Sequence, residues 1–181
     1  MYGYFDRKAT YRTKTYIAGD WTGDKDAIDV LYSWKENRHL TLDWVDAHDL
    51  TQARDSSLNC SIKASLKTRL DVSKTFVLVV GNETKNLRSG SCSYCDSYSA
   101  YFSRCNRGHS VDYRSYIDYE CDKAVEAGIK IVVLYNSSIV DKDKCPFVLR
   151  NRGVHVAMKR YNFTYGRYEW DYQAVKNAIE Q

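Results

Sequence analysis

The chain has 181 residues, of which 44% are hydrophobic, and a formal net charge of +4. This length fits one domain with a substantial core, and the acidic and basic residues alternate without the clustered basic run that is typical of nucleic-acid-binding proteins. No segment approaches the ~20 apolar residues of a membrane span, and the first residues lack the apolar region of a secretory signal. We therefore expect a cytoplasmic protein whose partners include neither a membrane nor nucleic acid.

The predicted elements alternate between strands and helices. An arm over residues 1–13 precedes a single domain that spans residues 14–181. Strands are expected at 14–18, 40–45, 75–80, 129–135 and 154–159, and helices are expected after Asp24, along the apolar stripe Leu58, Ile62, Leu66 and Leu70, at 113–128 and at 170–179. This order predicts an α/β fold with a doubly wound, flavodoxin-like parallel sheet of about five strands in the order 2-1-3-4-5. The expected core includes Ile17, Val77, Val79, Ile131 and Val133.

The segment 83–112 interrupts this alternation. It is rich in Ser, Tyr, Gly, Arg and Cys, and it is longer than an ordinary connection, so we interpret it as an insertion after the third strand. It contains a C-x2-C-x9-C-x3-H pattern made of Cys92, Cys95, Cys105 and His109. Four such ligands predict a structural zinc ion that orders the segment. The alternative is unpaired or packed thiols, with the tyrosines of the segment either packing it onto the sheet or lining a pocket.

Ligands of doubly wound sheets bind beyond the carboxyl ends of the strands. Three segments are expected at that edge, namely 19–21, 46–49 and the loop after Gly81. The polar residues of 46–49 form either an acid/base or metal-binding cluster, or a group that caps the end of a strand, which is the more common arrangement. The position of a receiver-type phosphoacceptor aspartate holds Gly81 and Asn82, which excludes phosphotransfer, and no nucleophile motif or phosphate-binding loop is present.

Glu120 stands out within the helix expected at 113–128. In a helical projection it lies between the apolar stripe and the polar side, next to Tyr116. It has no basic residue four positions away, and only Lys123 is available at the third position. A carboxylate that is partly removed from water without a local partner is a candidate functional group. The alternative is a glutamate at the rim of the sheet that bonds a loop amide.

Five segments share their pattern with one known family: Tyr16-Ile17-Ala18 with Asp20, Asp46-Ala47-His48-Asp49-Leu50, Ala53-Arg54-Asp55-Ser56-Ser57, residues 76–81, and Tyr116-Ile117-Asp118-Tyr119-Glu120. They resemble the bacterial TIR-like domains, which have a flavodoxin-like sheet and include the TIR-like subunit of the Thoeris antiphage system. The resemblance spans residues 14–136 and is interrupted by the insertion. Relatives usually have Trp at the place of Tyr116, and the glutamate that ends this last segment is their catalytic residue in NAD cleavage.

The resemblance implies that the protein is an NAD nucleosidase or ADP-ribosyl cyclase-like hydrolase with Glu120 as its catalytic residue. It implies substrate-binding roles for Gly19, Asp20, Trp21, Asp46, His48 and Tyr116. The expected product is ADP-ribose, a cyclic isomer or a conjugate, sensed by a downstream effector in antiphage defence. TIR-like enzymes commonly complete their sites between subunits, so we expect a homo-oligomer on activation, with the Tyr-rich insertion meeting the neighbour.

Two other functions remain open. Many TIR domains only assemble, and in a non-catalytic interaction module all of these residues would be structural. A nucleoside deoxyribosyltransferase-like enzyme would also use a glutamate beside a sugar. Comparing turnover of NAD and of nucleosides distinguishes the three hypotheses.

Overall fold

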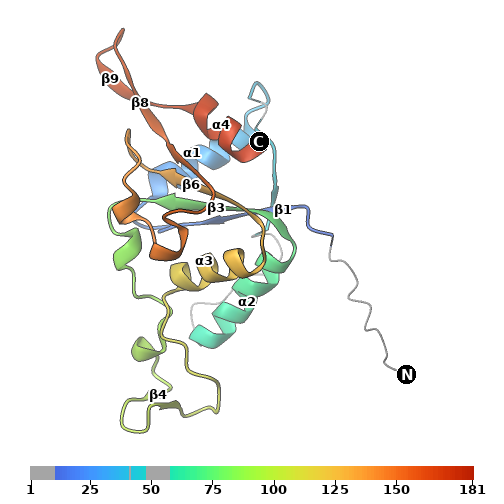
Figure 1. Ribbon diagram of the computed structural model, residues 1–181, viewed down its shortest axis with the longest axis vertical. Helices are drawn as coiled ribbons and strands as arrows, with labels where there is room; N and C mark the ends of the chain where they lie inside the picture. The colour runs from blue at the N-terminus through green and yellow to red at the C-terminus, as the bar shows by residue number, and fades with distance from the viewer. Residues whose placement is uncertain (1–10, 41, 48–57) are drawn as a thin grey trace.

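A five-stranded parallel sheet forms the centre of the molecule. The computed structural model describes residues 11–40, 42–47 and 58–181 of the chain (Figure 1). The strands of this sheet are β1 (Lys14–Ala18), β2 (Val45–Asp46), β3 (Ser73–Val80), β6 (Lys130–Tyr135) and β7 (Val154–Ala157). They lie in the order β2-β1-β3-β6-β7, and each neighbouring pair is parallel. The predicted order 2-1-3-4-5 and the predicted fold class are therefore confirmed.

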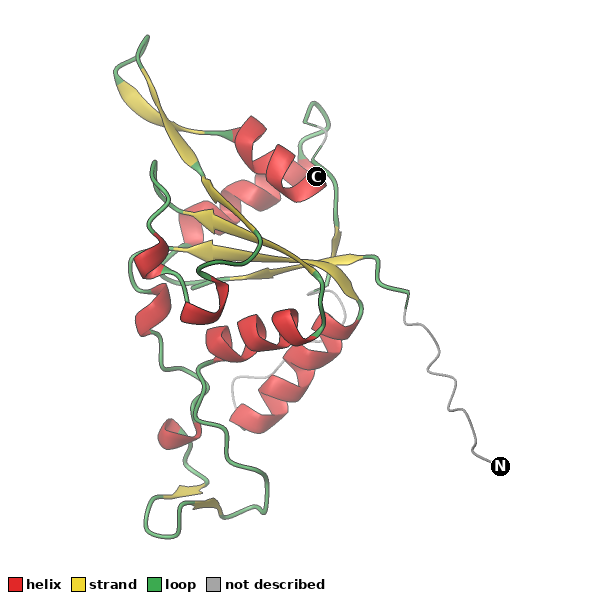
Figure 2. Ribbon diagram, viewed as in Figure 1, coloured by secondary structure: helices red, strands yellow, loops and turns green. Residues whose placement is uncertain are grey.

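Helices cover both faces of the sheet. They are α1 (Lys25–Glu36), α2 (Asn59–Asp71), α3 (Tyr116–Glu126) and α4 (Tyr172–Glu180). Helices α1 and α4 lie on one face, and α2 and α3 lie on the other, as Figures 1 and 2 show. Among the helices of the described ranges, none has the length and apolar character that crossing a membrane requires.

The central strand β3 divides the core into two clusters. Successive side chains of a strand point to opposite faces, so Phe76 and Leu78 pack against α2 and α3, whereas Val77 and Val79 pack against α1 and α4. The five predicted core residues, Ile17, Val77, Val79, Ile131 and Val133, are all buried. The unbroken apolar run at 75–80 was thus a correct indication of a strand buried on both faces.

Helix α3 is shorter than the predicted helix at 113–128. It begins after Ser115, whose hydroxyl accepts a hydrogen bond from the backbone N–H of Asp118 at 3.0 Å and caps the helix. Gly128 follows its end with a φ of +61°, the left-handed conformation that commonly terminates a helix. Tyr113 therefore lies outside the helix.

Helix α1 begins after Asp24, as predicted. Asp24 occupies its N-cap position without a capping bond, and the carboxylate accepts a hydrogen bond from Asn136 Nδ2 at 3.1 Å instead. Helix α2 begins at Asn59, and the segment Asp55-Ser56-Ser57, whose residue types commonly cap a helix start, lies outside the described residues. Its predicted apolar stripe does pack against β3, because Ile62, Leu66 and Leu70 all contact the same core cluster.

The strand predicted at 40–45 is wrong in its bounds. Only Val45 and Asp46 pair with β1, and residues 42–44 make no ladder. Leu42 and Trp44 are nevertheless buried in the cluster beneath α1 and α4. Their alternation reflects this packing against helices and not membership of the sheet.

The C-terminal region contains a hairpin that the sequence analysis missed. The strand predicted at 154–159 ends at Ala157, and the chain continues into β8 (Lys159–Asn162) and β9 (Arg167–Trp170), which pair antiparallel. This hairpin projects from one end of the molecule (Figure 1). Helix α4 consequently begins at Tyr172 and not at 170, with Asp171 as its N-cap.

The insertion at 83–112 projects from the opposite end (Figure 1). It consists of short 3₁₀ turns at Thr84–Asn86 and Cys92–Tyr94 and of a small hairpin of β4 (Tyr98–Ser99) and β5 (Arg104–Cys105). Lys63 on α2 is buried beneath its return path and donates hydrogen bonds to the carbonyl oxygens of Asp112 at 3.3 Å and Arg114 at 2.7 Å. One lysine therefore ties the end of the insertion to the helical layer.

Candidate active site

A cavity of about 280 Å³ opens at the edge of the sheet where β1 and β3 end. It is enclosed by the loop after β1, by α2, by α3 and by the start of the insertion. Its lining residues are Tyr16, Gly19, Asp20, Trp21, Ile62, Leu66, Arg69, Leu87, Ser89, Tyr116, Ile117 and Glu120. Ligand sites of doubly wound sheets are found at this edge, so the cavity is the candidate active site.

Glu120 is buried at the cavity, with 6% of its surface exposed. The helical projection had placed it at the margin of the apolar stripe, but the sheet covers that margin. The hydroxyl of Tyr16 on β1 donates a short hydrogen bond to Glu120 Oε1. The donor to Glu120 is thus a core tyrosine, and not the loop amide of the alternative interpretation.

The environment of Glu120 keeps its carboxyl close to its titration point at neutral pH. Burial disfavours the charged form and raises the pKa to about 7. The hydrogen bond from Tyr16 and the positive charge of Arg69 act in the opposite direction and limit the rise. A carboxylate whose pKa is raised this far by burial in a cleft is a candidate functional residue.

Tyr16 and Arg69 are site residues that the sequence analysis did not predict. Tyr16 is completely buried, and its ring stacks on Phe76 with centroids 5.9 Å apart. Arg69, on α2, is 8% exposed and lines the same cavity. One signal was available in the sequence, because Arg69 follows Leu66 by three positions and precedes Leu70, and so places a cation on an apolar stripe.

The loop after β1 forms one wall of the cavity, as predicted for Gly19, Asp20 and Trp21. A side chain at Gly19 would approach the backbone and side chain of Val79 to 3.2–3.4 Å, so the glycine lets this loop lie close to β3. Asp20 shapes the turn, because its Oδ1 accepts a hydrogen bond from the backbone N–H of Thr22 at 3.0 Å. Trp21 is 48% exposed and presents an aromatic surface at the entrance.

Tyr116 forms the wall opposite that loop. Its hydroxyl donates a hydrogen bond to Asn59 Oδ1 at 2.9 Å, which joins the first turns of α2 and α3. Its ring lies directly on Gly90, where a Cβ atom would come within 2.4 Å of a ring carbon. The insertion therefore holds the ring of Tyr116 in place through Gly90, which has no side chain.

Residues 16–89 match the family described as Thoeris protein ThsB, TIR-like domain. This segment of the chain is similar to a TIR-like domain. The matched segment includes β1, the cavity loop, α2 with Arg69, and β3, and it ends before Glu120. No curated protein matches the chain. The flavodoxin-like parallel sheet is consistent with the TIR-like similarity of the matched segment, whereas the argument for Glu120 rests on its own geometry.

Asp46 does not line the cavity of the TIR-like domain. It is buried at the end of β2 and accepts a hydrogen bond from the hydroxyl of Tyr32 at 2.6 Å, which joins β2 to α1. This is the structural arrangement that had been considered for the polar residues of 46–49. The predicted site residue His48, and Asp49 beside it, lie outside the described residues.

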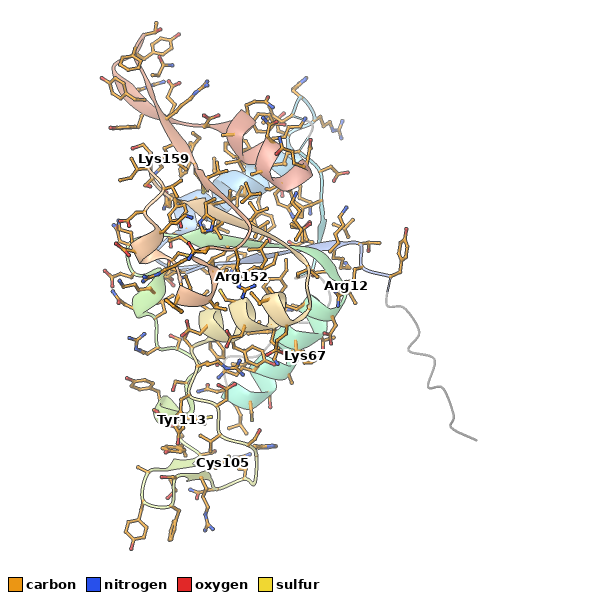
Figure 3. The ribbon with its side chains drawn as sticks, in the orientation of Figure 1. Arg12, Lys67, Cys105, Tyr113, Arg152 and Lys159 are labelled. Carbon is orange, nitrogen blue, oxygen red and sulfur yellow. The ribbon has the colours of Figure 1, made fainter. Side chains whose placement is uncertain are left out.

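The four predicted zinc ligands are not gathered into one site. Within the described ranges, no group of three or more His, Cys, Asp or Glu side chains is placed to hold a metal ion. Cys92 is buried and its sulfur accepts a hydrogen bond from the backbone of Asp112, whereas Cys105 lies in the projecting hairpin (Figure 3). Zinc content stays a prediction.

Proposed function

We propose that this TIR-like domain cleaves the bond between nicotinamide and ribose in NAD, with Glu120 as the catalytic carboxylate. The observation that carries the proposal is the position of Glu120, which is buried at a cavity on the ligand-binding edge of the sheet and hydrogen-bonded to Tyr16. A carboxylate with a purely structural role would not need to face an open cavity.

The chemistry of the reaction matches this arrangement. Nicotinamide leaves as a neutral ring, so its departure needs no acid. Positive charge develops on the ribose, as in the cleavage of glycosides, and a fixed carboxylate stabilises that charge. The low polarity around Glu120 strengthens the interaction, which is the benefit that offsets the cost of burying the group.

The size of the cavity supports binding of one half of the dinucleotide. At about 280 Å³ it lies near the lower end of the range of small-molecule sites, and it suits the nicotinamide and its ribose. Trp21 at the entrance and Tyr116 on the opposite wall offer aromatic surfaces for the bases. Gly19 and Asp20 complete the wall beside the ribose.

The remaining expectations follow from the same proposal. The product is ADP-ribose, a cyclic isomer or a conjugate, depending on whether water, the adenine of the substrate or another molecule attacks the ribose. A downstream effector senses this product in antiphage defence. The enzyme acts in the cytoplasm and associates with further copies of itself on activation.

The test is mass analysis of products after incubation of the purified protein with NAD, with and without lysate of phage-infected cells. Wild-type protein should release nicotinamide, and Glu120→Gln should reduce kcat by about two to three orders of magnitude, the usual effect of removing one preorganised charge contact. Glu126→Gln is the matched control, because Glu126 is exposed near the end of the same helix.

Three results would contradict the proposal. Full activity of Glu120→Gln would remove Glu120 from the mechanism. Turnover of nucleosides in place of NAD would indicate a deoxyribosyltransferase-like enzyme. Self-association without any turnover would indicate an interaction module.

A further inference from the structure

Three side chains from three different elements meet at the catalytic edge of the cavity. Glu120 comes from α3, Tyr16 from β1 and Arg69 from α2, and all three are buried. The hydroxyl of Tyr16 donates to Glu120 Oε1. Arg69 lines the same cavity, and its positive charge acts on Glu120. A hydrogen bond from Tyr16 and a buried cation therefore act on one carboxylate.

Both groups favour the charged form of Glu120. The hydrogen bond from Tyr16 stabilises the carboxylate and the positive charge of Arg69 attracts it, so both lower the pKa that burial raises. Burial and the neighbouring carboxylate raise the pKa of Tyr16 well above its ordinary value. The hydroxyl therefore keeps its proton throughout the physiological range and remains a donor.

The other titratable groups near Glu120 give it less support. Asp20, in the loop after β1, lines the same cavity and is acidic. The hydroxyl of Tyr116 donates its hydrogen bond to Asn59. Cys121, next to Glu120 on α3, is buried and has a raised pKa, first because of its burial and then because of the charge of Glu120, so it stays a neutral thiol. Among these groups, Tyr16 and Arg69 are the ones that favour a charged Glu120.

We propose that Tyr16 and Arg69 are positioning residues that hold the Glu120 carboxylate charged and oriented toward the cavity, with Tyr16 in direct contact and Arg69 acting through its positive charge. The proposal rests on the function proposed above, because it assigns these residues to the same reaction. It extends that function by stating how a deeply buried carboxylate remains ionised often enough to work near neutral pH.

The direct test follows the titration of Glu120 itself. Protein labelled with carboxyl-¹³C glutamate is titrated by NMR, and the Glu120 signal is assigned by its absence in Glu120→Gln. The wild-type midpoint should lie near 7. In Tyr16→Phe, which keeps the ring that stacks on Phe76, the midpoint should rise by about one pH unit, the size of one lost hydrogen bond to a charged group. Tyr168→Phe, on the exposed β9 strand, should leave it unchanged.

Arg69 provides a second, independent pair of variants. Arg69→Gln should raise the midpoint, and Arg69→Lys should restore most of the wild-type value because it retains the positive charge. This pair keeps the proposal open to test even if Tyr16→Phe does not fold. The acidic limb of the pH profile for NAD cleavage should move together with the NMR midpoint in each variant.

The two proposals fail in different ways. An unchanged Glu120 midpoint in Tyr16→Phe and Arg69→Gln would overturn the positioning role, whether or not NAD is cleaved. A shifted midpoint in a protein that never consumes NAD would support the positioning role and overturn the proposed function. Equal shifts in Arg69→Lys and Arg69→Gln would show that the positive charge of Arg69 is not what keeps Glu120 ionised.

Discussion

Glu120 combines two properties that oppose each other. Its burial strengthens its action on a positive charge in the cavity, but the same burial raises the pKa of its carboxyl to about 7. A substantial fraction of the molecules therefore carries a neutral Glu120 at neutral pH. The balance is set by Tyr16 and Arg69, which lie on elements other than the helix that carries the carboxylate.

The first prediction concerns the stability of Glu120→Gln. The pKa of Glu120 is higher in the folded protein than in the unfolded chain, where a glutamate titrates near its ordinary value of about 4.3. The folded state thus binds the proton more tightly, and its stability falls as pH rises from about 4.3 to about 7. Glu120→Gln removes this loss and should be more stable than wild type at pH 8 by up to about 3 kcal/mol.

Chemical denaturation at pH 8 and at pH 5 measures this effect. The advantage of the glutamine variant should shrink at pH 5, because the folded wild type is then almost fully protonated and most of the pH range over which its stability falls lies above pH 5. Glu126→Gln should follow the wild type at both values. A glutamine variant that is less stable at pH 8 would show that the buried carboxylate contributes to folding and is not a cost accepted for activity.

Among the elements, the insertion is the one that departs most from an ordinary α/β connection. It leaves the sheet after β3 and returns at the start of α3, and it lines the cavity through Leu87 and Ser89 near its beginning. Among the contacts that hold it there are Lys63 of α2 at its return and Gly90 beneath the ring of Tyr116. Each contact leads to a separate prediction.

Lys63→Met should loosen the return of the insertion. The substitution leaves the carbonyl oxygens of Asp112 and Arg114 without the buried ammonium donor, and removing such a partner costs about 2 kcal/mol. We expect a lower melting temperature and faster proteolysis within 83–112. Lys67→Met, one turn further along α2, replaces an exposed lysine paired with Asp71 and should change stability by less than about 0.5 kcal/mol. Equal effects of the two variants would argue against an anchoring role for Lys63.

Gly90→Ala should disturb the cavity wall. Gly90 has a φ of +93°, and its Cβ would overlap the ring of Tyr116. We expect the ring to move, and the KM for NAD should rise in steady-state kinetics. Gly108→Ala is the matched control, because Gly108 has a φ of +76° with open space around it. That variant should lose about 1 kcal/mol of stability and keep the wild-type KM. If both variants keep the wild-type KM, the position of Tyr116 does not matter for binding.

At the scale of the whole molecule, two hairpins with exposed aromatic residues project from opposite ends (Figure 1). The insertion exposes Tyr94, Tyr101 and Phe102, and the β8–β9 hairpin exposes Phe163 and Tyr165. Exposed aromatic groups of this kind are typical of protein interfaces. The surface of the insertion is the one predicted to meet a neighbouring copy on activation.

Exchanging Tyr101 and Phe102 for serine together should therefore weaken self-association. Both side chains are exposed, so the fold should be retained, and sedimentation in the presence of NAD should show a shift toward monomer with reduced turnover. Tyr165→Ser, at the opposite end, is the control. A wild-type enzyme that is fully active as a monomer would contradict the expectation.

The fold was predictable from sequence because burial determines the pattern of its elements. The run at 75–80 can only be a strand covered on both faces, and Ile131 and Val133 repeat that pattern in β6. The β8–β9 hairpin was missed because it has no buried face that would impose a period on residues such as Tyr161. At the site, Glu120 was predicted as a candidate residue from the projection of its own helix. The roles of Tyr16 and Arg69 were not predicted, because they depend on contacts between distant segments of the chain.

The separation of Tyr16 and Glu120 has a consequence for biosynthesis. These two hydrogen-bonded side chains lie 104 positions apart in the chain. Two strands of the central sheet that lie between them in sequence, β2 and β3, pair in parallel with β1, and such non-local pairings form slowly. A nascent chain that has not yet released α3 from the ribosome has no complete cavity and no Glu120. The NAD cleavage proposed above would therefore begin only after synthesis has passed that helix.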